Sequence, residues 1–171
     1  MTFIRIIAVL ILFGCSNVQA CTTASSVMVQ RVFKESIRLN EAFKKSVDAP
    51  GDTDYRSLRK QVESYEESRA IPCLKRTVVL MRQAPDASLM DALFAHAYSH
   101  ENSANETESE VLATVFVLRG AAFADAWGKS SPEVKGVLAT RVASGWELTK
   151  KRYSSAKRQQ IESRLKRLDS H

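Results

Sequence analysis

Two histidines, His96 and His100, stand four residues apart in a segment with helical periodicity. On an α-helix this spacing places both imidazole rings on one face, where they can hold a metal ion together. Acidic residues that follow closely and could add a carboxylate ligand are Glu101, Glu106, Glu108 and Glu110. A zinc-protease motif needs glutamate directly after the first histidine, where this chain has Ala97. Because two ligands fall short of the usual three or four, we predict no metal and no cofactor, with His96 and His100 as weak candidates.

The cysteines offer a second kind of chemistry. The sequence contains Cys15, Cys21 and Cys73. If Cys15 is removed or acylated during export, an even pair remains, and an even pair in an exported protein is typical of a disulfide. We therefore predict a Cys21–Cys73 disulfide rather than a thiolate nucleophile, which would have to be reduced and activated. The sequence has no nucleophile elbow, phosphate loop or calcium loop, so we predict that the protein is not an enzyme.

Residues 1–20 have the order of a signal peptide. Arg5 precedes the apolar run 6–13, and small and polar residues then lead to Val18-Gln19-Ala20. The apolar run is too short to span a bilayer, which takes about 20 residues. We predict cleavage after Ala20 and a periplasmic location. As an alternative, Leu12-Phe13-Gly14-Cys15 resembles a lipobox, which would make the protein a lipoprotein anchored at Cys15.

The remaining residues, 21–171, are predicted to form one domain made of helices. Apolar residues recur at helical spacing, and no segment alternates apolar and polar residues for long enough to indicate a strand. The predicted helices begin near Ser26, Thr53, Ile71, Asp86, Thr107 and Ser131, and the last is either continuous or broken at Ser154-Ser155. Thr107 and Glu110 match a capping box ahead of one long apolar helix that ends near Gly128. The prediction is an all-α, compact bundle of six or seven helices, with both histidines at the end of the fourth.

Charge is concentrated near the end of the chain. The whole sequence carries a net charge of +6, and the segment 149–168 carries eight basic residues and one acid, a net charge of +7. We predict that this segment binds an acidic protein or envelope component, or lies against anionic lipid; a merely solvated helix face is the alternative. The compartment argues against nucleic acid. The predicted partner-binding residues are Lys150, Lys151, Arg152, Lys157, Arg158, Arg164, Lys166 and Arg167.

These features together favour a non-catalytic envelope protein that binds a macromolecular partner. In compartment and architecture the chain is similar to periplasmic immunity proteins, which neutralise secreted toxins that attack the cell wall. That likeness implies an inhibitor role and a toxin partner. Two alternatives stay open, a lipoprotein scaffold anchored at Cys15 and a metal-assisted hydrolase that uses His96 and His100. The sequence leaves the oligomeric state open.

Overall fold

The computed structural model describes residues 21–48, 55–103 and 105–168, and every regular element in these ranges is a helix. The elements are α2 (Ser26–Asp48), α3 (Tyr55–Tyr65), the π-helical turn η1 (Glu66–Ala70), α4 (Ile71–Gln83), α5 (Ala87–Ser99), α6 (Glu106–Leu118), α7 (Gly120–Lys129), α8 (Pro132–Thr149), the 3₁₀ turn η2 (Lys150–Arg152) and α9 (Ser155–Leu168). Because α3, η1 and α4 run on as one rod, the described residues form seven helices. The predicted all-α bundle is confirmed.

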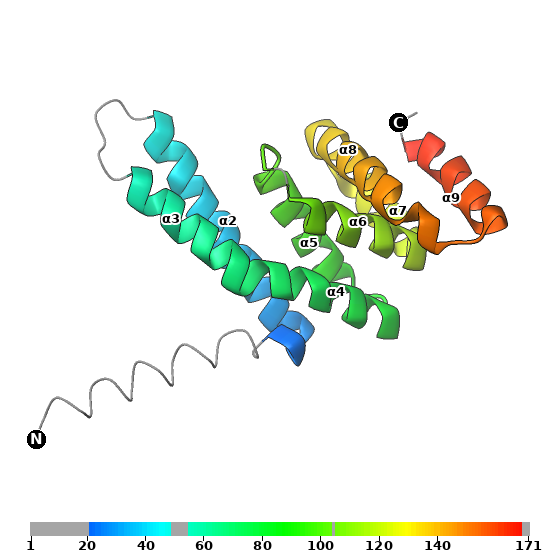
Figure 1. Cartoon of the computed structure of the whole chain (residues 1–171), viewed down its shortest axis with the longest axis horizontal. Coiled ribbons are helices and arrows are strands. Elements are labelled where there is room, and N and C mark those ends of the chain that lie inside the picture. Colours follow the sequence, from blue (N-terminus) through cyan, green and yellow to red (C-terminus); the bar gives the residue numbers. More distant parts are fainter. Residues whose placement is uncertain (1–20, 49–54, 104, 169–171) are drawn as a thin grey trace, which may run out of the picture.

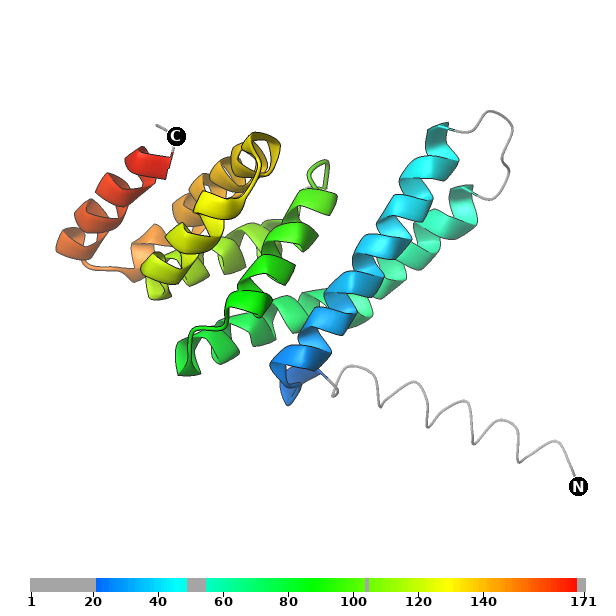
Figure 2. The same cartoon turned by 180° about the vertical axis from the view of Figure 1, so that it is seen from behind.

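The helices form two groups joined through the middle of the molecule. Figure 1 shows α2 lying antiparallel to α3 on one side, and Figure 2 shows the same pair from behind. Next to this pair lie α5 and α6, and beyond them α7, α8 and α9. The most extensive packing joins α6 to α8, and α2 packs against α5. The histidine helix α5 is therefore held between α2 on one side and α8 on the other.

A close approach of backbones holds α6 and α8 together. Gly145 of α8 lies so near to α6 that a Cβ atom there would stand 1.8 Å from the carbonyl oxygen of Ser109. Only a residue without a side chain fits at this point. Fully buried apolar residues on either side, including Leu112 and Leu138, complete the contact. The long apolar run of α6 follows from this position, since α4 packs against it as well.

A π-helical turn joins α3 to α4 where the sequence predicts a new helix. The backbone N–H of Ile71 donates to the carbonyl oxygen of Glu66, five residues earlier, and the rod continues without a break. Pro72 lies within the first two positions of α4, where its missing N–H is tolerated. The predicted start of a helix at Ile71-Pro72 is confirmed, because α4 begins at Ile71, although the chain before it is helical as well. A turn of this kind is wider than an α-helical turn, because its hydrogen bonds join residues five apart instead of four.

The prediction of a single long helix from Thr107 to Gly128 is wrong. The chain bends by 113° between α6 and α7, and Arg119 stands at the bend. Its guanidinium donates to the carbonyl oxygens of Met81 and Arg82 at the end of α4, which fixes the corner. In the described ranges no single helix is long and apolar enough to cross a membrane; α6 and α7 reach that standard only when taken together across this bend.

The start of α6 has a different cap from the one predicted. The side chain of Asn105 accepts a hydrogen bond of 3.1 Å from the backbone N–H of Glu108, so Asn105 is the N-cap. Thr107 lies inside the first turn, and the predicted Thr107–Glu110 capping box is wrong. Glu108, whose backbone N–H donates to this cap, lies on the buried side of α6.

The predicted cysteine pair is confirmed. Cys21 and Cys73 form a disulfide with a Cα–Cα distance of 5.1 Å, and both residues are buried. The bond ties the segment that precedes α2 to α4, which lies next to it. The predicted signal segment 1–20, with its cleavage point at Ala20 and the alternative anchor Cys15, lies outside the described residues.

Candidate functional site

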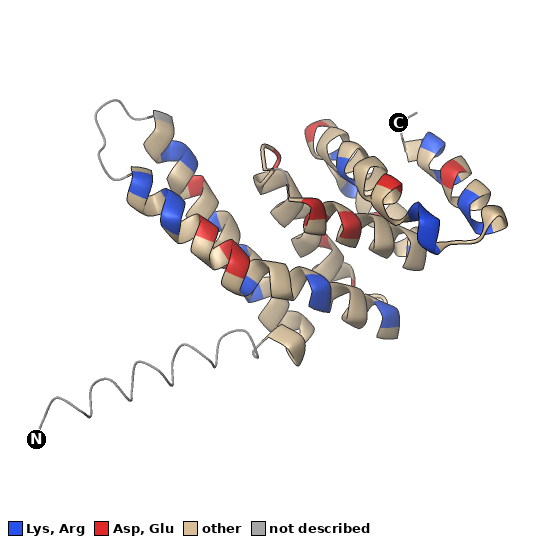
Figure 3. Ribbon diagram, in the orientation of Figure 1, with Lys and Arg blue, Asp and Glu red and all other residues tan. Residues whose placement is uncertain are grey.

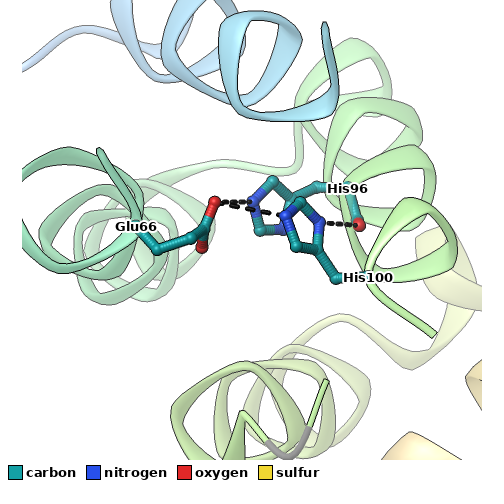
Figure 4. Close-up of side chains that lie close together, drawn as sticks. All are labelled: Glu66, His96 and His100. Atoms are coloured by element: carbon teal, nitrogen blue, oxygen red, sulfur yellow. Dashed lines mark hydrogen bonds and ion pairs between the residues drawn. The ribbon is translucent and has the colours of Figure 1, made fainter. Parts of the chain in front are cut away.

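The two histidines of α5 meet a glutamate that comes from the π-helical turn. The rings of His96 and His100 stack with centroids 4.4 Å apart. Glu66 Oε1 lies 3.2 Å from His100 Nε2 and 3.7 Å from His96 Nε2, and Figure 4 shows the three side chains pointing toward one another. One ligand atom from each residue lies within 4.8 Å of the other two. These three residues could hold one metal ion.

A serine from α2 adds a fourth polar atom to the same point. Ser36 Oγ lies 3.1 Å from His96 Nε2 and 3.3 Å from His100 Nε2, and it donates a hydrogen bond to Glu66 Oε1. Ser36 is almost completely buried. Three elements that are distant in sequence, α2, η1 and α5, therefore each contribute to one cluster.

The other side of His96 faces a buried ion pair. His96 Nδ1 lies 2.5 Å from Glu108 Oε1, and Glu108 Oε2 lies 3.5 Å from the guanidinium of Arg141 on α8. Arg141 also donates to the carbonyl oxygens of His100, at 2.5 Å, and Ser103, at 2.8 Å. Arg141 thus satisfies backbone groups at the end of α5 and orients the carboxylate that orients His96.

The hydrogen bonds within the cluster favour a positive charge on His96 and a negative charge on Glu66. Burial opposes a positive charge on His96, but hydrogen bonds to Glu108 and Glu66 outweigh it and raise the pKa of the imidazole to about 9. Burial also opposes a charge on Glu66, yet hydrogen bonds with His100, His96 and Ser36 hold the pKa of that carboxyl well below its usual range. His96 and Glu108 are fully buried, and the side chain of Glu66 is 14% exposed. The cluster can hold a cation but has little access for a substrate.

The carboxylates that the sequence offers as ligands have other positions. Glu101 pairs with Lys44, and Glu110 pairs with Arg152. Glu106 is exposed, and Glu108 reaches the Nδ1 atom of His96, on the side away from His100 and Glu66. The carboxylate beside both Nε2 atoms belongs to Glu66, which sequence reasoning missed. A signal was present, because Glu66 stands four residues after Val62 and eight after Leu58, which is helical spacing with these apolar residues.

The predicted basic segment covers η2 and α9. Figure 3 shows its lysines and arginines along both elements. Within the described residues, Lys150 forms an ion pair with Glu147 and Arg152 forms one with Glu110. The exposed members of the segment are Lys151, Arg152, Lys166 and Arg167, and the half-buried ones are Lys150, Lys157, Arg158 and Arg164.

Arg164 has a structural role within this segment. Its guanidinium lies 4.5 Å from the ring centroid of Phe116 and donates to the carbonyl oxygen of that residue at 3.0 Å. A Cβ atom at Gly120 would stand 1.5 Å from Arg164 Nη2, so the glycine leaves room for the arginine. Arg164 therefore holds α9 against the corner between α6 and α7, together with the fully buried Ile161.

A groove of about 840 Å³ opens beside this anchor, between α9 and the corner formed by α6 and α7. Its floor is apolar and includes Val117, Ala121 and Trp127, and its charged lining residues are Lys135, Arg164 and Arg167. No acidic residue of the described chain lines it. The predicted basic segment thus borders an apolar hollow with a cationic rim.

Comparison of the chain with protein-family models, with curated proteins and with solved structures finds no match.

Proposed function

We propose that this chain is an exported, non-catalytic bacterial protein that binds an acidic, partly apolar segment of a partner protein. The observation that carries the proposal is the groove beside α9, which combines an apolar floor with the cationic residues Lys135, Arg164 and Arg167. Apolar side chains of a partner would displace water from the floor, and its carboxylates would pair with the rim.

The location outside the cytoplasm is supported by two observations. The order of charge, apolar run and small residues over residues 1–20 is that of a signal peptide. The buried Cys21–Cys73 disulfide belongs to an oxidising compartment, since cytoplasmic thiols are kept reduced. Among exported partners we favour a secreted toxin that attacks the cell wall, on the likeness to periplasmic immunity proteins. A lipoprotein anchored at Cys15 is the alternative to cleavage after Ala20, and both depend on residues outside the described ranges.

The burial of the two histidines argues against the alternative of a metal-assisted hydrolase. A hydrolytic metal site keeps one coordination position open to water and substrate. His96 is fully buried and His100 is 5% exposed, so a substrate of any size would have to part α2 from α5 to reach them. This burial supports a non-catalytic role.

The test compares charge reversals at the groove with matched reversals elsewhere. Lys135→Glu with Arg167→Glu alters the rim, and Arg56→Glu with Lys60→Glu makes the same change in net charge on exposed positions of α3. A partner captured from the envelope fraction is purified and titrated calorimetrically against each form at low and high salt. We expect the rim variant to lose at least tenfold in affinity, the α3 variant to change little, and wild-type binding to weaken with salt.

Two outcomes would contradict the proposal. Equal losses in both variants would mean that only net charge matters, so that the groove has no specific role. Unchanged binding in the rim variant would place the interface elsewhere on the molecule. Circular dichroism of both variants checks that neither reversal unfolds the chain.

A further inference from the structure

We propose that Glu66, His96 and His100 bind one Zn²⁺ ion, which holds the π-helical turn against α5. This goes beyond partner binding, because the site lies in the interior rather than at the groove. It also goes beyond the two-histidine candidate, since Glu66 raises the ligand count to three. Two imidazole nitrogens and a carboxylate are a usual zinc ligand set.

The distances suit a single small cation. Zinc–ligand bonds of about 2.0–2.2 Å place the ligand atoms of a tetrahedral site about 3.3–3.6 Å apart. Glu66 Oε1 lies 3.2 Å and 3.7 Å from the two Nε2 atoms, which brackets that spacing. Ser36 Oγ stands 3.1 Å and 3.3 Å from the same nitrogens and donates to Glu66 Oε1, so it borders the space in which the ion would lie.

The hydrogen bonds on the opposite side of each ring fix the nitrogen that faces the site. The Nδ1 atom of His100 lies 2.7 Å from Ser99 Oγ and 3.0 Å from the carbonyl oxygen of His96. The Ser99 hydroxyl donates its hydrogen to that carbonyl, so both neighbours of Nδ1 act as acceptors and this nitrogen carries the hydrogen. The Nδ1 atom of His96 faces the carboxylate of Glu108 at 2.5 Å, which acts in the same way. Zinc-bound histidines show this arrangement, in which an outer carboxylate or carbonyl orients the ring and makes it a stronger ligand.

At the centre, a zinc ion would take the place of the proton that His96 Nε2 shares with Glu66. With both Nδ1 atoms protonated, neutral rings present bare Nε2 lone pairs toward Glu66 Oε1. Ser36 carries one hydroxyl hydrogen and donates it to Glu66, so it has none for either ring. Two lone pairs and a carboxylate oxygen thus converge in a buried space. A zinc ion satisfies all three; additional protons on the rings are the competing solution.

The first experiment is metal uptake by the wild-type protein. The protein is purified, stripped with a chelator and titrated with Zn²⁺, and with Co²⁺ as a spectroscopic probe. We expect one equivalent to bind, the melting temperature to rise, and Co²⁺ to give the visible absorption of a tetrahedral site. Failure to take up either ion would overturn the proposal and leave a cluster held by protons alone.

Variants assign the ion to these residues. Glu66→Gln and His100→Gln should each abolish stoichiometric uptake, whereas Glu63→Gln, an exposed change on the preceding helix α3, should leave it intact. Glu108→Gln removes an orienting group and no ligand, so it should weaken zinc affinity by about 10- to 100-fold. Uptake that survives both ligand variants would place the ion elsewhere and refute the site.

A measurement on wild-type protein covers the case in which a ligand variant fails to fold. Nitrogen-15 NMR of the imidazoles should show zinc shifting the Nε2 resonances of His96 and His100 while both Nδ1 atoms stay protonated. Resonances that do not move in zinc-loaded protein would refute coordination by these rings. This outcome leaves the groove proposal untouched, since the partner titration does not depend on zinc.

Discussion

The histidine–glutamate cluster and the basic groove differ in how their charges meet solvent. In the cluster, Glu66, His96 and Glu108 lie among side chains from five helical elements, and each charge has a partner within 4 Å. At the groove, the half-buried Lys135 and the exposed Arg167 border an apolar floor. Buried charges depend on their partners for the fold itself, whereas exposed charges contribute about 0–1 kcal/mol each. Substitutions should therefore change stability at the cluster and binding at the groove.

The largest effect is expected at the centre of the cluster. Glu108→Ala leaves His96 and Arg141 buried without their carboxylate, and removing one member of a buried ion pair costs about 3–5 kcal/mol. Urea unfolding of the protein measures the loss. The control is Glu110→Ala on the same helix, which breaks only the exposed pair with Arg152 and should cost less than 1 kcal/mol. Similar losses from both substitutions would remove the distinction between buried and exposed charge.

Reduction of the disulfide should affect the cluster side of the molecule selectively. The bond between Cys21 and Cys73 closes a loop with a sequence separation of 52, which is worth about 4 kcal/mol on the chain-entropy estimate. Hydrogen exchange of the reduced protein should speed up most in α2 and α4 and least in α9. Intact mass with and without reduction before alkylation verifies the bond, and two alkylated thiols in native, unreduced material would contradict it.

The contact between α6 and α8 lies between the two regions. Substitutions there should have an intermediate effect on the free energy of unfolding. Gly145→Ala forces a Cβ atom against the backbone of Ser109, which cannot move aside, and overpacking of this kind costs about 1–3 kcal/mol. Gly136→Ala on the same helix points into open space and should instead stabilise by about 0.5–1 kcal/mol. Thermal unfolding of both variants measures the two changes in stability. Changes of the same sign would contradict the close approach of α8 to α6 at Gly145.

The smallest effect is expected at the N-cap of α5. Asp86 accepts hydrogen bonds from the backbone N–H of Leu89, at 2.9 Å, and from Ser26 of α2, at 2.5 Å. Burial opposes its charge, but these bonds and those from Ser88 lower its pKa. Asp86→Ala should cost about 0.5–2 kcal/mol at neutral pH.

The pH dependence of that loss has a definite sign. A carboxyl whose pKa is lower in the folded state stabilises the fold above its unfolded pKa of about 3.9 and loses that contribution as pH falls through the folded pKa. The difference in unfolding free energy between wild type and Asp86→Ala should therefore be full at pH 7 and shrink toward pH 3. A difference that does not change with pH would show that the charge has no part in the cap.

Local patterns predicted the helices well where a cap or a loop marked their ends. The predicted helix from Ser26 to Val47 corresponds to α2, and Asp86 does begin α5. The corner at Arg119 escaped prediction because the apolar run 111–118 continues into alanines without a proline. That corner is fixed by hydrogen bonds from Arg119 to carbonyl groups 37 and 38 residues away, which no local pattern contains.

Only the part of the candidate site that lies on a single helix could be predicted from the sequence. The spacing of His96 and His100 predicts that the rings lie together, and they do. Glu66 is 30 residues before His96 on another helix, so its arrival depends on how α2, α3 and α5 pack. Ser36 had no chemical signal at all, since a small hydroxyl on the inner face of α2 looks like ordinary packing. Chemistry assembled across helices is visible only once the packing is known.

The π-helical turn between α3 and α4 makes the cluster sensitive to chain length. In an α-helix each residue advances the chain by about 100°. Deleting one residue from positions 67–70 would close the widened turn and rotate α3 against α4 by about that angle, with every charged side chain of the cluster still encoded. Glu66 would then leave the histidines while Cys73 kept its place in the disulfide. Among natural variants of this chain, the number of residues between Val62 and Cys73 would therefore mark which of them retain the cluster, independently of whether its residues are conserved.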